Sequence, residues 1–168
     1  MELAQKRPRI DIPSSTAEKM TEYASLLGIV FILWTLFSYW SGLPDEIPIH
    51  YGLTGDPDSY GAKATLFILP LITVILYAGF TILRKYPHVY NYPVEITQEN
   101  AGIQYSLALK LIGLLKVEIV WLFAYIHWRT CLIGMGEASS LGIWFLPVFV
   151  ALILLTAILY VIKARKAA

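Results

Sequence analysis

From Tyr23 to Pro44 the chain carries no charged residue. A helix needs roughly 20 residues to cross the hydrocarbon core of a bilayer, because each residue adds about 1.5 Å. A cleaved signal peptide has a shorter apolar core, of roughly 7 to 15 residues, followed by a small-residue cleavage site. The segment FSYWSGL offers no such site, so the run predicts a retained membrane helix. Ser15 and Glu18 have the spacing of a capping box, and the helix is expected to begin near Thr16.

The whole chain is too apolar for a soluble domain of 168 residues, since 57% of its residues are hydrophobic, 15% are charged and the mean hydropathy is +0.61. The single cysteine, Cys131, excludes an internal disulfide and a cysteine-based metal cluster. We predict an all-α integral membrane protein with four transmembrane helices, at about residues 23–42, 64–83, 110–129 and 141–162. The helices are expected to form one domain, residues 16–168, after a loosely ordered cytoplasmic tail, residues 1–15.

Lysine and arginine residues are distributed unevenly among the connections. Ten lie before the first span, between the second and third spans, or after the last: Lys6, Arg7, Arg9, Lys19, Arg84, Lys85, Lys110, Lys163, Arg165 and Lys166. The other two connections carry one each, Lys63 and Arg129, and Lys116 lies inside the third span. Because positive charge is retained in the cytoplasm, both termini are predicted to be cytoplasmic and residues 43–63 extracytoplasmic, in the plasma membrane.

Residues 43–63, LPDEIPIHYGLTGDPDSYGAK, form a polar segment between the first two spans. Its prolines and glycines exclude a long helix and favour an irregular or short-β loop, with an extended piece at 47–51 and tight turns at 54–58. A loop of this length without its own helix is usually functional or disordered. We therefore interpret the outward loop as the functional part of the chain.

The same loop resembles the signature of the SdpI-like bacterial membrane family, whose leading domain of unknown function has the pattern LP-x-x-IP-x-H-x-x-x-x-G-x-P-D-x-x-G-x-K. The matching positions here are Leu43, Pro44, Ile47, Pro48, His50, Gly55, Pro57, Asp58, Gly61 and Lys63. The later segment NYPVEITQENAGIQYSLALKLIG also looks like members with this domain. The resemblance implies a multi-pass architecture, and it implies for some members a role in immunity and signalling against a secreted toxin. The chain is expected to lack the second SdpI domain of the longer members.

His50, Asp56 and Asp58 supply nitrogen and oxygen ligands from one short loop. A divalent cation held by them, with His127 or Glu137 completing the set, would make the chain a small metal-dependent membrane enzyme. The alternative is that the aspartates bond to backbone N–H groups of their own turn and His50 packs beneath them. The spacing of His50, Asp56 and Asp58 matches no strong metal motif, so no cofactor is expected. Binding of a divalent metal is kept as the alternative.

Tyr60, Lys63 and Arg129 are the other candidate ligand- or partner-binding residues on the outward side. Arg129 is the one arginine expected there. An ion pair with one of the loop acids would pin the loop onto the third helix, and binding of an anionic substrate is the alternative role. Both interpretations predict that Arg129 lies at the outer end of its helix.

Glu118 is expected near the middle of the third span, where an acid is costly and marks either a polar packing contact or a proton or substrate path. Lys116, two positions away, points to another face and is expected to snorkel toward the interface. Thr73 and Tyr77 in the second span are the predicted partners of a protonated Glu118. The alternative is a proton relay, which would suit a proton-coupled transport subunit.

Common catalytic motifs do not occur, because the sequence contains no Walker A, G-x-S-x-G, H-E-x-x-H or C-x-x-C pattern. Nucleic acid is not an expected partner, since topology explains the basic clusters. The sequence predicts a membrane protein of unknown molecular activity, more a recognition module than an enzyme. Its expected partners are membrane lipid and a peptide, a toxin-like ligand or another membrane protein, and a homo-oligomer is left open.

Overall fold

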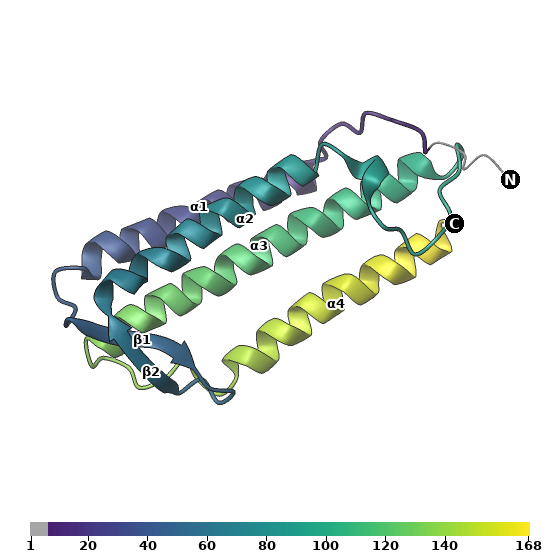
Figure 1. The fold of residues 1–168 in the computed structure, drawn as a ribbon. Coiled ribbons are helices and arrows are strands. Elements are labelled where there is room, and N and C mark those ends of the chain that lie inside the picture. The colour runs from purple at the N-terminus through teal and green to yellow at the C-terminus, as the bar shows by residue number, and fades with distance from the viewer. Residues whose placement is uncertain (1–6) are drawn as a thin grey trace, which may run out of the picture.

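The computed structural model describes residues 7–168 as a bundle of long helices with a β-hairpin at one end (Figure 1). The elements in chain order are α1 (Thr16–Tyr39), β1 (Glu46–Tyr51), β2 (Pro57–Ala62), the 3-10 turn η1 (Lys63–Phe67), α2 (Ile68–Leu83), the 3-10 turn η2 (Pro87–Val89), α3 (Ala101–Gly134) and α4 (Phe145–Lys166). The capping prediction for α1 is confirmed, because the Ser15 side chain accepts a hydrogen bond from the Glu18 N–H.

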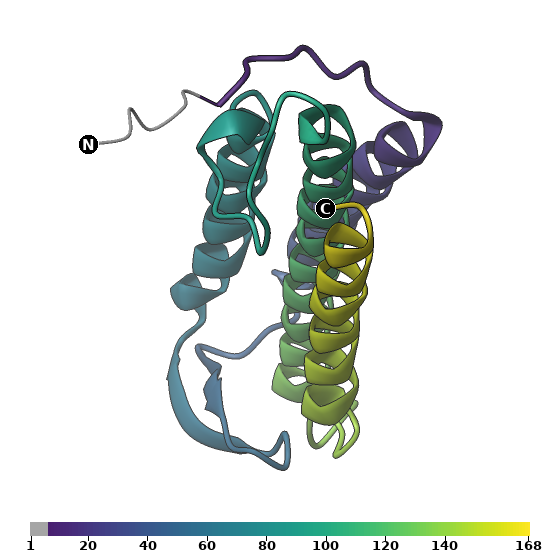
Figure 2. The same ribbon diagram turned by 90° about the vertical axis from the view of Figure 1, so that its right-hand side faces the viewer.

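Helix α3 is the centre of the bundle and packs against α1, α2 and α4, while α4 stands apart from α1 and α2 on the other side of α3 (Figures 1 and 2). Glycine allows α1 to approach α3 closely. A Cβ atom at Gly28 would lie 2.6 Å from Val120 Cγ1, and one at Gly113 would lie 2.8 Å from Thr21 Oγ1. Small residues at helix contacts are typical of helices that pack in membranes.

The two ends of the bundle differ in structure. The hairpin end consists of β1, β2 and residues 135–144, and the basic end consists of the tail from Arg7, residues 84–100 and the C-terminus (Figures 1 and 2). Strands β1 and β2 pair antiparallel from Glu46 with Ala62 to Tyr51 with Pro57, with irregularities on both sides of His50. The expected extended piece at 47–51 is therefore present as β1, and it is paired with a second strand.

Three segments are long and apolar enough to cross a membrane: Thr16–Tyr39, Lys63–Leu83 and Phe145–Lys166. They carry many exposed apolar side chains, and in α4 only Ala164 is buried. Helix α3, which contains the expected span 110–129, is not among these three. It carries four charged residues, and two of them, Lys116 and Glu118, lie near the middle of the helix. The last helix begins at Phe145 rather than at 141, because a turn with the positive-φ residue Gly142 precedes it.

The described part of the N-terminal tail is tied to the basic end. Arg7 donates to the carbonyl oxygen of Tyr90 at 2.6 Å and its guanidinium lies 5.6 Å from the centre of the Tyr92 ring. Tyr105 in α3 donates to the carbonyl oxygen of Pro8 at 2.9 Å. Residues 7–15 therefore form no helix or strand but are joined to the bundle through Arg7 and Pro8, and Lys6 lies outside the described residues.

Candidate functional site beneath the hairpin

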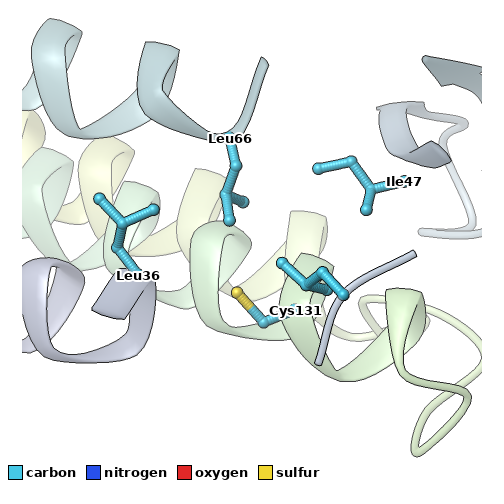
Figure 3. Packing of buried hydrophobic residues seen from close by; sticks show 5 residues of the cluster. Leu36, Ile47, Leu66 and Cys131 are labelled. Carbon is cyan, nitrogen blue, oxygen red and sulfur yellow. The ribbon is translucent and has the colours of Figure 1, made fainter. Parts of the chain in front are cut away.

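A cluster of buried apolar side chains fastens the hairpin to the helices. Leu36 of α1, Ile47 of β1, Leu66 of η1 and Cys131 of α3 direct their side chains toward one another (Figure 3). Leu43 completes the cluster, and Gly134 leaves the space it needs, since a Cβ there would lie 2.8 Å from Leu43 Cδ2. Burial of these side chains from four elements makes the hairpin part of the bundle rather than a free loop.

A backbone hydrogen bond joins the turn of the hairpin to the connection before α4, and a tyrosine side chain joins that connection to α3. The Leu141 N–H donates to the Gly55 carbonyl oxygen at 2.8 Å, and the Tyr125 hydroxyl of α3 donates to the Leu141 carbonyl oxygen at 2.7 Å. Gly55 has a φ of +87°, and a Cβ on it would lie 3.0 Å from the Gly142 carbonyl oxygen. A glycine is required here by both the left-handed backbone and the close approach.

A cavity of about 570 Å³ lies beneath the hairpin, in the size range of ligand pockets. Its walls are mostly apolar and come from β1, η1, α2, α3 and the start of α4: Ile47, Pro48, Ile49, His50, Tyr51, Gly52, Leu53, Gly55, Thr65, Leu66, Ile68, Leu69, Ile126, Thr130, Leu141, Phe145 and Leu146. Apolar walls with a few polar groups favour binding of an apolar ligand that is oriented by a small number of hydrogen bonds.

Tyr51 and Thr130 are two of the polar residues in the cavity wall, and their hydroxyl oxygens are 2.7 Å apart. Burial raises the pKa of Tyr51 to about 12. The phenol therefore stays neutral at physiological pH and can both donate and accept hydrogen bonds.

His50 and Asp58 form an exposed pair on the hairpin. His50 Nδ1 lies 2.6 Å from Asp58 Oδ1, and the two side chains are 70% and 49% exposed. Asp56 accepts a hydrogen bond from the Thr54 hydroxyl at 2.7 Å, within the turn. The aspartates therefore bond to a hydroxyl and to His50 rather than to backbone N–H groups of the turn. His50 is exposed and does not pack beneath them as expected.

The four residues predicted to share a metal do not meet in one place. His127 is fully buried between α3 and α1, where Nδ1 lies 2.8 Å from Thr35 Oγ1, whereas His50 is exposed on the hairpin. Among residues 7–168 no group of three or more histidine, cysteine, aspartate or glutamate side chains is arranged to hold a metal ion. The position of His127 on the α1-facing side of its helix explains the separation.

Of the remaining candidates, Tyr60 is 57% exposed on β2, and Lys63 is engaged within the protein. The Lys63 ammonium donates to the Leu43 carbonyl oxygen at 3.3 Å and lies 5.0 Å from the centre of a Trp40 ring. Arg129 donates to the Ser140 carbonyl oxygen, with Nε at 3.0 Å. The predicted ion pair between Arg129 and a loop acid is therefore wrong, because the guanidinium bonds to the backbone of the connection before α4.

Glu118 faces α4 rather than α2. The Thr156 hydroxyl donates to Glu118 Oε1 at 2.5 Å, while Oε2 is buried without a partner among residues 7–168. Thr73 donates to the Leu69 carbonyl oxygen of its own helix at 2.6 Å, and Tyr77 donates to Glu22. The predicted Glu118 partners, Thr73 and Tyr77, are therefore wrong, because both lie on a helix that packs on a different side of α3.

An ion-pair network between α1, α2 and α3 was missed by sequence reasoning. Lys116 pairs with Glu22, lies 3.3 Å from Thr81 Oγ1 and sits 4.7 Å from the centre of the Tyr77 ring. Only 3% of the Lys116 side chain is exposed, so the expectation that it snorkels to the interface is wrong. Glu18 pairs with Arg84 in the same region. The signal in the sequence is the spacing of Glu18 and Glu22, which places both acids on one face of α1.

One family model and one relative match parts of this chain. A family model described as a domain of unknown function, DUF1648, matches residues 26–74, which include the hairpin and the start of α2. An uncharacterized protein of Archaeoglobus fulgidus is 35% identical over 78 residues, which cover 41% of this chain and 42% of that protein. The chain thus matches about two fifths of the length of this relative. No solved structure matches the chain. The family model thus covers the hairpin together with the later part of α1 and the first part of α2, and it describes a domain of unknown function.

Proposed function

We propose that the chain is a multi-pass plasma-membrane protein in which all four helices cross the bilayer, with the hairpin end outside and the basic end in the cytoplasm. The exposed apolar surfaces of α1, α2 and α4 support insertion. Helix α3 crosses between these helices, and its charged residues Lys116 and Glu118 are bonded to neighbouring helices. The excess of lysine and arginine at the basic end supports the orientation.

Within this arrangement the hairpin end is a recognition module that binds an apolar segment of a peptide or of another membrane protein. The observation that carries this proposal is the apolar cavity of about 570 Å³ beneath a hairpin that is fastened to α1, η1 and α3. Ile49, Leu53 and Tyr60 expose 47%, 84% and 57% of their surface on the hairpin and its turn, where they are available to a partner. A rigid scaffold that presents apolar groups next to a pocket is typical of a binding site.

The resemblance of residues 43–63 to SdpI-like proteins supports the same proposal, since an immunity-like protein would bind a secreted toxin at its outward face. A peptide ligand would place an apolar side chain in the cavity and bond to Tyr51 or Thr130 at its wall. His50 and Asp58 lie at the exposed side of the same strand pair, where they can contact the polar part of the ligand.

Photo-crosslinking in cells tests this function. A crosslinking amino acid at Leu53 or Tyr60 is expected to capture a specific protein or peptide, whereas the same group at Tyr86, 49% exposed at the basic end, is expected not to capture it. Leu146→Trp would narrow the cavity and reduce the capture, and Leu154→Trp, on the same helix but outside the cavity wall, is the matched control. Absence of capture at both hairpin positions, or equal capture at Tyr86, would contradict the proposal.

A further inference from the structure

A second recess lies between α3 and α4 near the basic end. Its volume is about 110 Å³, too small for a whole ligand but sufficient for part of one. Two hydrogen-bonded contacts bound it along the helices. Gln104 Nε2 donates to the Ala164 carbonyl oxygen at 2.8 Å at one end, and Thr156 donates to Glu118 at the other. Thr156 and Ala164 are eight positions apart in α4, about 12 Å of helix, so the two contacts hold the helices around a short crevice.

The crevice is basic at one end and apolar along its length. Lys110 of α3 and Lys163 of α4 line it and both are exposed. Neither lysine forms an ion pair with an acidic side chain within residues 7–168. Leu114 and Leu159, which are 46% and 45% exposed, extend the lining from the lysines toward the middle of the bundle. Two cations at one end of an apolar groove match a molecule with an anionic head and a hydrocarbon chain.

We propose that this crevice binds an anionic phospholipid of the inner leaflet. The lipid phosphate would contact the ammonium groups of Lys110 and Lys163, and the first part of one acyl chain would lie over Leu114 and Leu159. Basic pockets between transmembrane helices on the cytoplasmic side are known to bind anionic headgroups. The proposal rests on the membrane insertion and orientation proposed above, but not on a ligand at the hairpin end.

The crevice also has a structural consequence. Helix α4 has one buried residue and is held to α3 by few polar contacts, so a lipid that bridges Lys110 and Lys163 would add a third contact between the two helices. Bound anionic lipid is therefore expected to stabilise the association of α4 with the rest of the bundle.

Native mass spectrometry of the detergent-purified full chain tests the site, with phosphatidylglycerol and phosphatidylcholine of identical acyl chains as probes. The unmodified chain is expected to retain one phosphatidylglycerol, and the double variant Lys110→Gln with Lys163→Gln to bind it about thirtyfold more weakly. The matched control is Lys19→Gln with Lys85→Gln, which removes the same charge at the same end of the bundle. The control pair is expected to leave the affinity unchanged.

Two further measurements separate the alternatives. Leu159→Trp would fill the crevice without changing charge and is expected to reduce retention of the lipid. If inorganic phosphate binds Leu159→Trp as strongly as it binds the unmodified chain and displaces the lipid from both, the site takes the free anion and not a lipid. Equal loss in the lysine control, or equal retention of phosphatidylcholine, would also overturn the proposal. The mass spectrometry measures lipid binding at the basic end, whereas the crosslinking measures capture of a partner at the hairpin end. Either proposal can therefore fail without the other.

Discussion

The two sides of α3 are packed in different ways. On the side of α1, a buried lysine pairs with Glu22, Trp121 Nε1 donates to the Ala24 carbonyl oxygen at 3.0 Å, and Gly28 allows close backbone approach. On the side of α4, the contacts include the Gln104 bond and the Thr156 bond to Glu118. The α1 side is thus a close-packed interface, whereas the α4 side leaves the cavity beneath the hairpin and the small crevice near the basic end.

This difference indicates that packing and ligand binding involve different parts of the bundle. Helices α1, α2 and α3 pack against one another, α3 contacts the hairpin, and α4 and α3 border both recesses. Ligand sites are expected where packing is incomplete, since a close-packed interface leaves no room for a guest. Substitutions on the α1 side and on the α4 side of α3 are therefore expected to lower the free energy of unfolding by different amounts.

The largest effect is expected from Glu22→Ala, which leaves Lys116 buried without its anion. We expect a loss of about 3 kcal/mol in the free energy of unfolding, the lower end for a broken buried pair because 35% of the Glu22 side chain is exposed. Reversible unfolding in mixed micelles with increasing dodecyl sulfate measures the loss. Adding Lys116→Met should recover most of it, since the unpaired charge is then removed. A double variant as unstable as Glu22→Ala would contradict this account.

Gly28→Ala is expected to cost about 1–2 kcal/mol, because the new Cβ would lie 2.6 Å from the stiff side chain of Val120. Gly79→Ala is the matched control. A Cβ at Gly79 meets nothing within 4 Å, so the substitution is expected to be neutral or stabilising by a few tenths of a kcal/mol. The same unfolding measurement compares the two. Equal effects would show that α1 and α3 are not packed as closely as described.

Thr156→Val removes the hydroxyl that bonds to Glu118 and is expected to cost about 1 kcal/mol, typical of a hydrogen bond between membrane helices. The loss in the free energy of unfolding should be smaller than for Glu22→Ala, because α4 is packed less closely against α3 than α1 is. Thr156→Ser keeps the hydroxyl and should restore stability. Crosslinking between cysteines placed in α3 and α4 reports whether α4 separates first. A larger loss than for Glu22→Ala would reverse the comparison of the two sides.

Tyr51→Phe is expected to have the smallest effect, about 0.5–1 kcal/mol, since it removes one hydrogen bond between the hairpin and Thr130. The folded-state pKa of about 12 lies above the ordinary value of 10.0. The stability that the neutral phenol contributes is therefore present below pH 10 and lost as the pH rises toward 12. The difference in unfolding free energy between the unmodified chain and Tyr51→Phe, measured from pH 8 to 11, should shrink at the alkaline end. A constant difference would contradict the assigned burial of Tyr51.

The helical segments could be read from the sequence because hydrophobicity and length are local properties. The uncharged run after Tyr23 predicted the first helix, and prolines and glycines predicted the irregular connection after it. The cap at Ser15 was also predictable, since it depends on residues three positions apart. Boundaries were less accurate. The last helix has the length expected for the span 141–162, but the turn at Gly142 moves its start to Phe145, and it continues to Lys166.

Partners across helices were not predictable in the same way, because they depend on which helix lies on which side of α3. Depth alone made Thr73 and Tyr77 the expected partners of Glu118, but rotation of α3 turns Glu118 toward Thr156. The same rotation turns Lys116 toward Glu22. A residue's depth follows from its position in the sequence, whereas its direction relative to other helices does not.

The sequence by itself determined an apolar helical chain with charge concentrated at one end and a proline-rich segment between its first two helices, since composition and periodicity act within a segment. Only the tertiary structure decided that Lys116 pairs with Glu22, that Arg129 bonds to the backbone near α4 rather than to the hairpin, and that α4 stands apart and leaves two recesses. The physical reason is that side-chain pairing and cavities depend on how helices are rotated and spaced against one another, which no single segment encodes.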